Sequence, residues 1–118
     1  MNKYNASQIH LIERPDGLPN QSHFKKVEIE LAPPTLGEVL VKNHYMSVDP
    51  YMRGRMRSEG VYADPYALNK PMYGGAVGEI IESRDSELRV GDIVLNNAAW
   101  QDSFVAKADA VSKLEPFD

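Results

Sequence analysis

The stretch Phe24-Lys25-Lys26-Val27-Glu28-Ile29-Glu30-Leu31 decides the fold class of this 118-residue chain. Val27, Ile29 and Leu31 stand two residues apart, and charged residues separate them. A period of two is typical of a β-strand that buries one face. We therefore predict a strand over residues 24–31 that is buried on one face.

Further strand signals lie on both sides of this stretch. Residues 8–13 alternate loosely and end at a turn-rich segment, Arg14-Pro15-Asp16-Gly17-Leu18-Pro19. Pro33-Pro34 interrupts the sheet because proline donates no ladder hydrogen bond, and residues 38–48 then resume it. In that strand one face is expected to carry Val39, Val41, Asn43, Tyr45 and Ser47.

The second half of the chain repeats the pattern. Strands are expected at 78–83, at 93–95 after the turn Val90-Gly91-Asp92, and within 100–107. Six or so strands separated by turns predict a mainly β domain that forms a sheet or a barrel.

The middle of the chain departs from this rhythm. Asp49 is a suitable N-cap and Pro50 a suitable first residue for a short helix over residues 51–56. Residues 58–70 show neither a strand period nor a helix period, so we predict a long loop. Loops of this length in compact domains are often functional.

Composition excludes several classes of protein. The net charge of −4 disfavours nucleic-acid and membrane-surface binding, which need clustered Lys and Arg. The absence of cysteine excludes disulfides and thiolate metal sites. No secretory signal and no apolar run of transmembrane length occurs in the chain, so we expect a soluble, cytoplasmic protein.

The expected short helix carries the first candidate site. Tyr51 could donate a hydrogen bond to a substrate carbonyl, because a phenol stays neutral until about pH 10. Alternatively, Tyr51 only packs at the barrel mouth and Asp49 pairs with Arg53 at helical spacing. Arg53, Arg55 and Arg57 suit phosphate recognition, but they also suit a solvated face or a contact to another domain.

Glycines provide the second candidate. Gly74-Gly75-Ala76-Val77-Gly78 precedes a strand rather than a helix, which disfavours a nucleotide-phosphate loop and favours a bend. At such a bend, a missing side chain would leave room for a flat ring of nicotinamide or substrate. Trp100 is either a core aromatic or part of a substrate pocket.

The three histidines, His10, His23 and His44, lie on different elements without metal-ligand spacing, so no metal site is expected.

A resemblance to a known family rests on four stretches and one residue, taken in order along the chain. They are Val39-Leu40-Val41-Lys42-Asn43, Met46-Ser47-Val48-Asp49-Pro50-Tyr51-Met52-Arg53, Gly78-Glu79-Ile80-Ile81-Glu82-Ser83, Val90-Gly91-Asp92-Ile93-Val94 and Trp100. Over nearly all of its length the chain resembles the zinc-independent medium-chain dehydrogenases/reductases, in the branch of leukotriene B4 12-hydroxydehydrogenase, prostaglandin reductase and plant double-bond reductases. The Asp-Pro-Tyr-Met-Arg run is specific to this branch, whereas the Gly-Asp-x-Val turn is common across the superfamily.

The resemblance implies a GroES-like, partly open β-barrel with one or two short helices over residues 1–118. This substrate-side domain would pack against a Rossmann domain that binds NADP and is absent from this chain. The cofactor-binding residues are accordingly expected beyond Asp118. Full-length relatives commonly form homodimers.

The implied reaction is NADPH-dependent reduction of the C=C bond of an α,β-unsaturated ketone or aldehyde, and the chain alone would be inactive. Tyr51 matches the family tyrosine that contacts substrate, while Gly75 and Trp100 are the further substrate-site candidates. The zinc ligands of other relatives have no counterpart near residues 48–51 or at Gly74. Gly75 also stands where some plant members carry a second tyrosine, so their substrate preference does not transfer.

Two other functions remain open at this point. Related zinc-free members reduce quinones with the same cofactor, and the residues do not separate quinones from enones. A barrel of this kind could also be a non-enzymatic binding or assembly module, because fold does not determine function.

Overall fold

The computed structural model describes residues 4–49, 51–56 and 65–114. Its elements, in chain order, are β1 (Tyr4–Leu11), the 3₁₀ turn η1 (Gln21–His23), β2 (Phe24–Leu31), β3 (Glu38–Met46), α1 (Tyr51–Arg55), β4 (Lys70–Pro71), β5 (Ala76–Ser83), β6 (Ile93–Asn96), β7 (Ser103–Lys107), the 3₁₀ turn η2 (Ala108–Ala110) and β8 (Ser112–Lys113).

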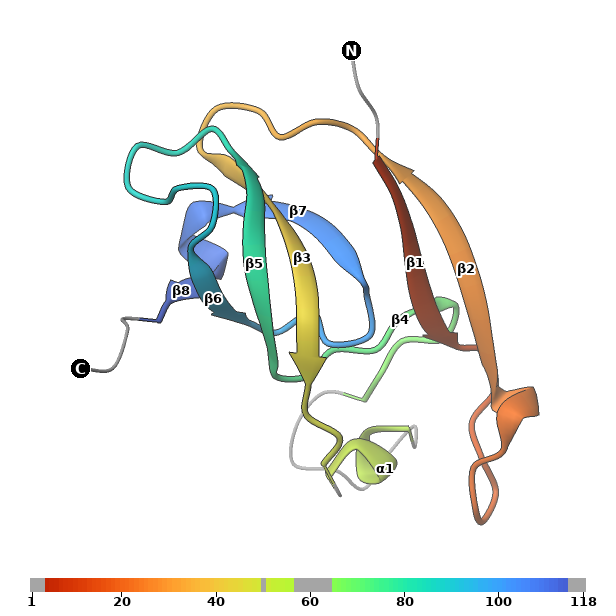
Figure 1. Ribbon diagram of the computed structural model, residues 1–118. Helices are drawn as coiled ribbons and strands as arrows, with labels where there is room; N and C mark the ends of the chain where they lie inside the picture. Colours follow the sequence, from red (N-terminus) through yellow and green to blue (C-terminus); the bar gives the residue numbers. More distant parts are fainter. Residues whose placement is uncertain (1–3, 50, 57–64, 115–118) are drawn as a thin grey trace.

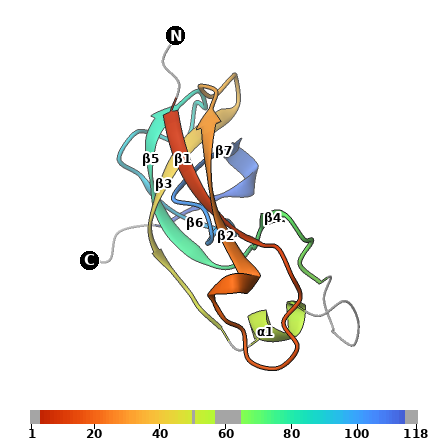
Figure 2. The same ribbon diagram turned by 90° about the vertical axis from the view of Figure 1, so that its right-hand side faces the viewer.

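The strands form two antiparallel sheets, in the orders β2-β1-β4 and β7-β3-β5-β6-β8 (Figure 1). The helix α1 lies beyond the end of β3, outside both sheets, and the loop between β1 and η1 extends toward it (Figure 2). The expected mainly β architecture with short helices is confirmed. Over the described residues the sheets do not close into a barrel, as expected of a partly open one.

Several predicted strands are confirmed with small shifts at their ends. β2 has the predicted bounds, and β6 follows a turn in which Gly91 adopts a positive φ of 96°. β1 begins at Tyr4 rather than near Gln8, because its whole length pairs with β2, from Tyr4 opposite Leu31 to Leu11 opposite Phe24.

The single face predicted for β3 is wrong. Val39 and Val41 are buried, but the register with β5 shifts between Leu40 and Val41 and again between Asn43 and Tyr45. An extra residue in one strand reverses the side-chain alternation beyond it. Tyr45 therefore lies opposite Val77 on the outward face and is 76% exposed.

Two hydrophobic clusters form the core. The first lines the inner face of the five-stranded sheet and comprises Val39, Val41, Ile80, Val94, Phe104 and Val111. The second packs α1 against β1 and the segment around β4, and comprises Leu11, Met52, Met56, Tyr66 and Met72. Met52 and Met56 are four residues apart and so share one side of the helical turn. The position of α1 thus depends on burial as well as on its connection to β3.

The glycines at 74, 75 and 78 occupy two different settings, with Gly74 and Gly75 between β4 and β5. None of them has a positive φ, and Gly78 lies inside β5. A Cβ built on Gly78 would stand 2.6 Å from Val41 Cγ1 and 2.9 Å from the Lys42 carbonyl oxygen. Gly78 is therefore required because β3 and β5 leave no space for a side chain there.

The predicted long loop is only partly described. Residues 57–64 lie outside the described part of the chain, and Lys70 and Pro71 form the short strand β4 opposite Leu11 and His10. Among the helices of the described ranges, none is both long and apolar enough to cross a membrane.

Candidate active site

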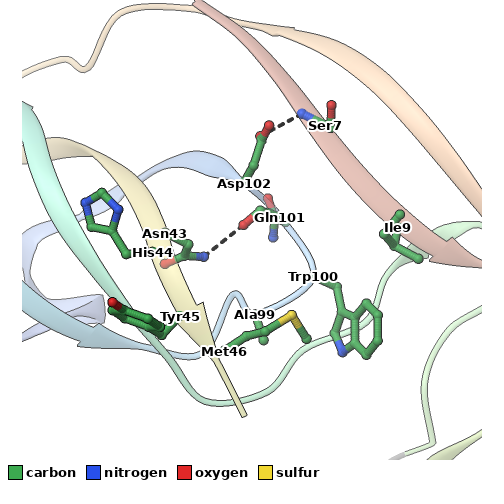
Figure 3. Close-up of a pocket in the computed structure, with 10 residues that line it drawn as sticks. All are labelled: Ser7, Ile9, Asn43, His44, Tyr45, Met46, Ala99, Trp100, Gln101 and Asp102. Carbon is green, nitrogen blue, oxygen red and sulfur yellow. Dashed lines mark hydrogen bonds between the residues drawn. The ribbon is translucent and has the colours of Figure 1, made fainter. Parts of the chain in front are cut away.

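A pocket of about 310 Å³ opens between β1 and the end of β3 (Figure 3). Its apolar wall includes Ile9, Met46, Ala99 and Trp100, and Figure 3 shows the Met46 side chain beside the Trp100 indole. The other lining residues are Ser7, Asn43, His44, Tyr45, Gln101 and Asp102. Mostly apolar walls with a few placed polar groups are typical of small-molecule sites.

A second pocket of about 420 Å³ lies against the start of β5 and the end of β6. It shares Tyr45 and Met46 with the first pocket, and its other lining residues are Ser47, Gly75, Ala76, Val77, Leu95 and Asn96. A Cβ built on Gly75 would meet no atom within 4 Å. The space beside Gly75 is thus open among the described residues, and the flat-ring role of this position stays a prediction.

The three predicted site residues do not all meet in one cavity. Trp100 lines the first pocket, and Gly75 lines the second. Tyr51 begins α1, the next element after β3, but its side chain lies outside the described residues. The end of β3 is the feature that connects these positions, because Tyr45 and Met46 line both pockets.

The indole nitrogen of Trp100 is buried and has no hydrogen-bond partner among the residues that the structure describes. Leaving a buried donor unpaired costs about 1–3 kcal/mol. The indole ring itself is half-buried and packs against the cluster around α1. Trp100 therefore combines an apolar pocket wall with one unsatisfied donor.

Two arginines fix α1 to the loop after β1. Arg14 donates to the carbonyl oxygens of Met56 and Tyr66, both at 3.0 Å, and Arg53 donates to the carbonyl oxygens of Pro15 and Gly17 at 3.2 and 2.7 Å. Arg14 had no distinguishing sequence signal, because a carbonyl-binding arginine in a loop has no periodicity.

The expected pairing of Asp49 with Arg53 is wrong for the described residues. Asp49 accepts a hydrogen bond from Ser47 Oγ at 2.7 Å, and no ion pair joins it to Arg53 in the described residues. The guanidinium of Arg55 lies 5.0 Å from the centroid of the Tyr73 ring, a cation–π distance. Arg57 lies outside the described residues, so the phosphate hypothesis for the three arginines stays untested.

The histidines have local structural roles. His10 Nε2 bonds to Gln8 Oε1 at 2.8 Å, His23 Nδ1 accepts from the Asn20 backbone N–H at 2.9 Å, and His44 Nε2 lies 3.1 Å from Glu79 Oε1. Within the described ranges, no three His, Asp or Glu side chains gather into a metal-ligating group.

Displaced pKa values occur in four groups that do not themselves line the pockets, although Glu28 accepts a hydrogen bond from Ser7 in the lining of the first pocket. Burial, with Lys70 and Lys25 nearby, lowers the pKa of His10. Hydrogen bonds from the backbone and side chain of Thr35 lower the pKa of Glu38, and the Ser7 hydroxyl lowers that of Glu28. Burial and the neighbouring Glu82 raise the pKa of Tyr4. None of these four groups lines either pocket.

Residues 7–114 match the model of a family described as the N-terminal domain of oxidoreductase. The chain belongs to this family. The resemblance seen in the sequence is thereby confirmed, and the match includes both pockets and α1.

Similar proteins agree with this assignment. The chain is 39% identical over 104 residues to the NADPH-dependent curcumin reductase of Escherichia coli (strain K12), covering 88% of this chain and 30% of that protein. It is 36% identical over 107 residues to the NADP(+)-dependent 2-alkenal reductase of Nicotiana tabacum, covering 86% of this chain and 31% of that protein.

Among solved structures, the fold resembles CurA from Vibrio vulnificus in complex with NADPH, with a TM-score of 0.79 and 38% identity over 85% of this chain and 30% of that one. The chain thus spans about a third of the length of these relatives.

Proposed function

We propose that this chain is the substrate-side domain of an NADP-dependent oxidoreductase that reduces the C=C bond of α,β-unsaturated ketones or aldehydes. The observation that carries the proposal is the pair of pockets around the end of β3, one against Trp100 and one over Gly75, in a chain of this family. Relatives named for curcumin and 2-alkenal reduction support the substrate class.

The cofactor would be NADPH, held mainly by a Rossmann domain in the rest of the protein. The open space at Gly75 fits one flat ring, either of the nicotinamide or of the substrate, because no atom lies within 4 Å of the missing Cβ. When bound, NADPH supplies the hydride that adds to the β-carbon of the substrate. We assign no residue of this chain to the cofactor.

The residues of this chain would orient the substrate and stabilise charge on it. As the β-carbon receives hydride, negative charge develops on the carbonyl oxygen, and a hydrogen-bond donor in a water-poor cleft stabilises it. We assign that donor role to the Tyr51 hydroxyl. Trp100 and Met46 would form the apolar wall, and an acceptor brought by the ligand would supply the missing partner of Trp100 Nε1.

The test is NADPH consumption by the full-length protein, offered first an enone and then a quinone of similar size. We expect turnover of the enone. Turnover of the quinone alone would transfer the proposal to quinone reduction, and no turnover of either would contradict an oxidoreductase of this kind.

Gly75→Tyr tests the second pocket. The substitution fills open space without a positive φ to strain, so we expect normal folding, but KM for a bulky enone should rise by about tenfold, the effect typical of a pocket that loses one fitting group. Steady-state kinetics with a small and a bulky enone measure this difference.

Gly75→Ala is the matched control and should leave both KM values near those of the wild type. Equal KM values for the bulky enone in Gly75→Tyr and the wild type would show that the second pocket holds no part of the substrate.

A further inference from the structure

Trp100 lies in a tight turn, Ala98–Gln101, and both ends of this turn face the Asn43 side chain. The Gln101 backbone N–H donates to the Ala98 carbonyl at 3.2 Å, which closes the turn. The amide Nδ2 of Asn43, on β3, donates to the carbonyl oxygens of the same two residues, at 2.9 Å to Ala98 and 2.8 Å to Gln101. Asn43 thus holds both ends of the turn that carries Trp100.

A second amide fixes the orientation of the first. Asn96 Nδ2 donates to Asn43 Oδ1 at 2.8 Å, and Asn96 Oδ1 accepts from the Ala98 backbone N–H at 2.8 Å. Two carbonyls on one side of Asn43 and a donor on the other leave its amide only one satisfactory orientation. All these groups are at least partly buried, where an unmet hydrogen bond is costly.

The same turn also connects the two sheets. Ile9 N–H, on β1, donates to the Trp100 carbonyl at 2.9 Å, and Asp102 N–H donates to the Ser7 carbonyl at 3.0 Å. β1 belongs to the three-stranded sheet and β3 to the five-stranded one. The turn is therefore held from β1 by backbone bonds and from β3 by the Asn43 side chain, with the first pocket between them (Figure 3). The Asn43 backbone N–H also donates to the Asp102 carbonyl at 2.8 Å, just after the turn.

We propose that Asn43 is a positioning residue, which closes the Ala98–Gln101 turn and so sets the place of Trp100 in the first pocket. The contribution to substrate binding rests on the proposed function, in which Trp100 contacts the substrate. The positioning of Trp100 does not depend on that function, so the two can be tested apart.

Asn43→Asp is the most informative substitution. It preserves the size of the side chain and the acceptor for Asn96, but it removes both donors and places a carboxylate oxygen against two carbonyl oxygens. A carboxyl group that faces hydrogen-bond acceptors has a raised pKa, because its charged form is disfavoured and its protonated form can donate a hydrogen bond. The defect should therefore be largest at high pH and should diminish as the pH falls.

Trp100 is the only tryptophan in the 118 residues, so the fluorescence of this chain reports on it directly. For Asn43→Asp we expect an emission shift to longer wavelength and stronger quenching by acrylamide, both reversing partly at low pH. In the full-length protein we expect KM for an enone to rise about tenfold with kcat nearly unchanged, as for a lost binding contact.

Asn97→Asp is the matched control, since it introduces the same charge at an exposed neighbouring position. The other titratable groups around the turn, Asp102 and the His44–Glu79 pair, are common to both variants, so their titration cancels in the comparison. If Asn43→Asp does not fold, Asn43→Ala, which removes both donors without adding a charge, is measured in the same way.

Wild-type fluorescence in Asn43→Asp at all pH values, or in a folded Asn43→Ala that replaces it, would overturn the positioning role. Shifted fluorescence with an unchanged KM would support the positioning of Trp100 but contradict its contact with substrate. Shifted fluorescence together with the raised KM is the result that supports both.

Discussion

Gly78→Ala is expected to lower the free energy of unfolding by about 3 kcal/mol, the upper part of the usual range for an overpacked core. The new Cβ would stand 2.6 Å from Val41 Cγ1, 2.8 Å from Asn43 Oδ1 and 2.9 Å from the Lys42 carbonyl oxygen. The side chains of Val41 and Asn43 have little freedom to move away, because the first is packed in the core and the second is hydrogen-bonded. The Lys42 carbonyl is part of the β3 backbone. Urea unfolding of the 118-residue chain, followed by Trp100 fluorescence, measures the effect.

Gly75→Ala provides the control for this prediction. The same methyl group is added three residues away, where no atom lies within 4 Å and φ is not positive. The free energy of unfolding should change little or rise by about 0.4–1 kcal/mol, because alanine restricts the unfolded chain. Equal stabilities for the two variants would contradict the close approach of β3 to Gly78.

Tyr51→Phe is expected to reduce kcat of the full-length protein about 10²- to 10³-fold, the loss measured when one oxyanion-stabilising donor is removed. The change removes only the hydroxyl. It retains the aromatic ring of residue 51. The backbone of α1 is held by Arg14, Arg53 and the packing of Met52 and Met56. Single-turnover reduction of an enone would separate this effect on chemistry from any effect on product release.

Tyr45→Phe tests whether Tyr45, rather than Tyr51, is the hydrogen-bond donor to the substrate carbonyl. Tyr45 lines both pockets but is 76% exposed, so water competes for its hydroxyl, and we expect kcat to stay near the wild-type value. A normal Tyr51→Phe together with an inactive Tyr45→Phe would transfer the donor role to Tyr45.

Much of the fold could be predicted because strand periodicity is local. The alternation over residues 24–31 and the glycine turn before β6 identified those elements directly. The face of Tyr45 could not be predicted in this way. It depends on where β3 slips against β5, a property of the pair of strands that neither strand shows alone.

The candidate site could be predicted only in part. Trp100 and Gly75 line pockets at the end of β3, but in separate cavities that Tyr45 and Met46 join. The hydrogen bonds of Arg14 and Asn43 to backbone carbonyls bring together residues between 42 and 58 positions apart. Contacts of this range leave no periodic signal in the sequence.

The central proposal, hydride transfer to the β-carbon of an enone, is tested most directly by isotope labelling. The full-length protein would be given an enone and NADPH carrying deuterium at both C4 positions of the nicotinamide, and the product would be examined by NMR. We predict a saturated ketone with deuterium at the β-carbon. Deuterium at the carbonyl carbon of an allylic alcohol, or no transfer of deuterium at all, would contradict the account.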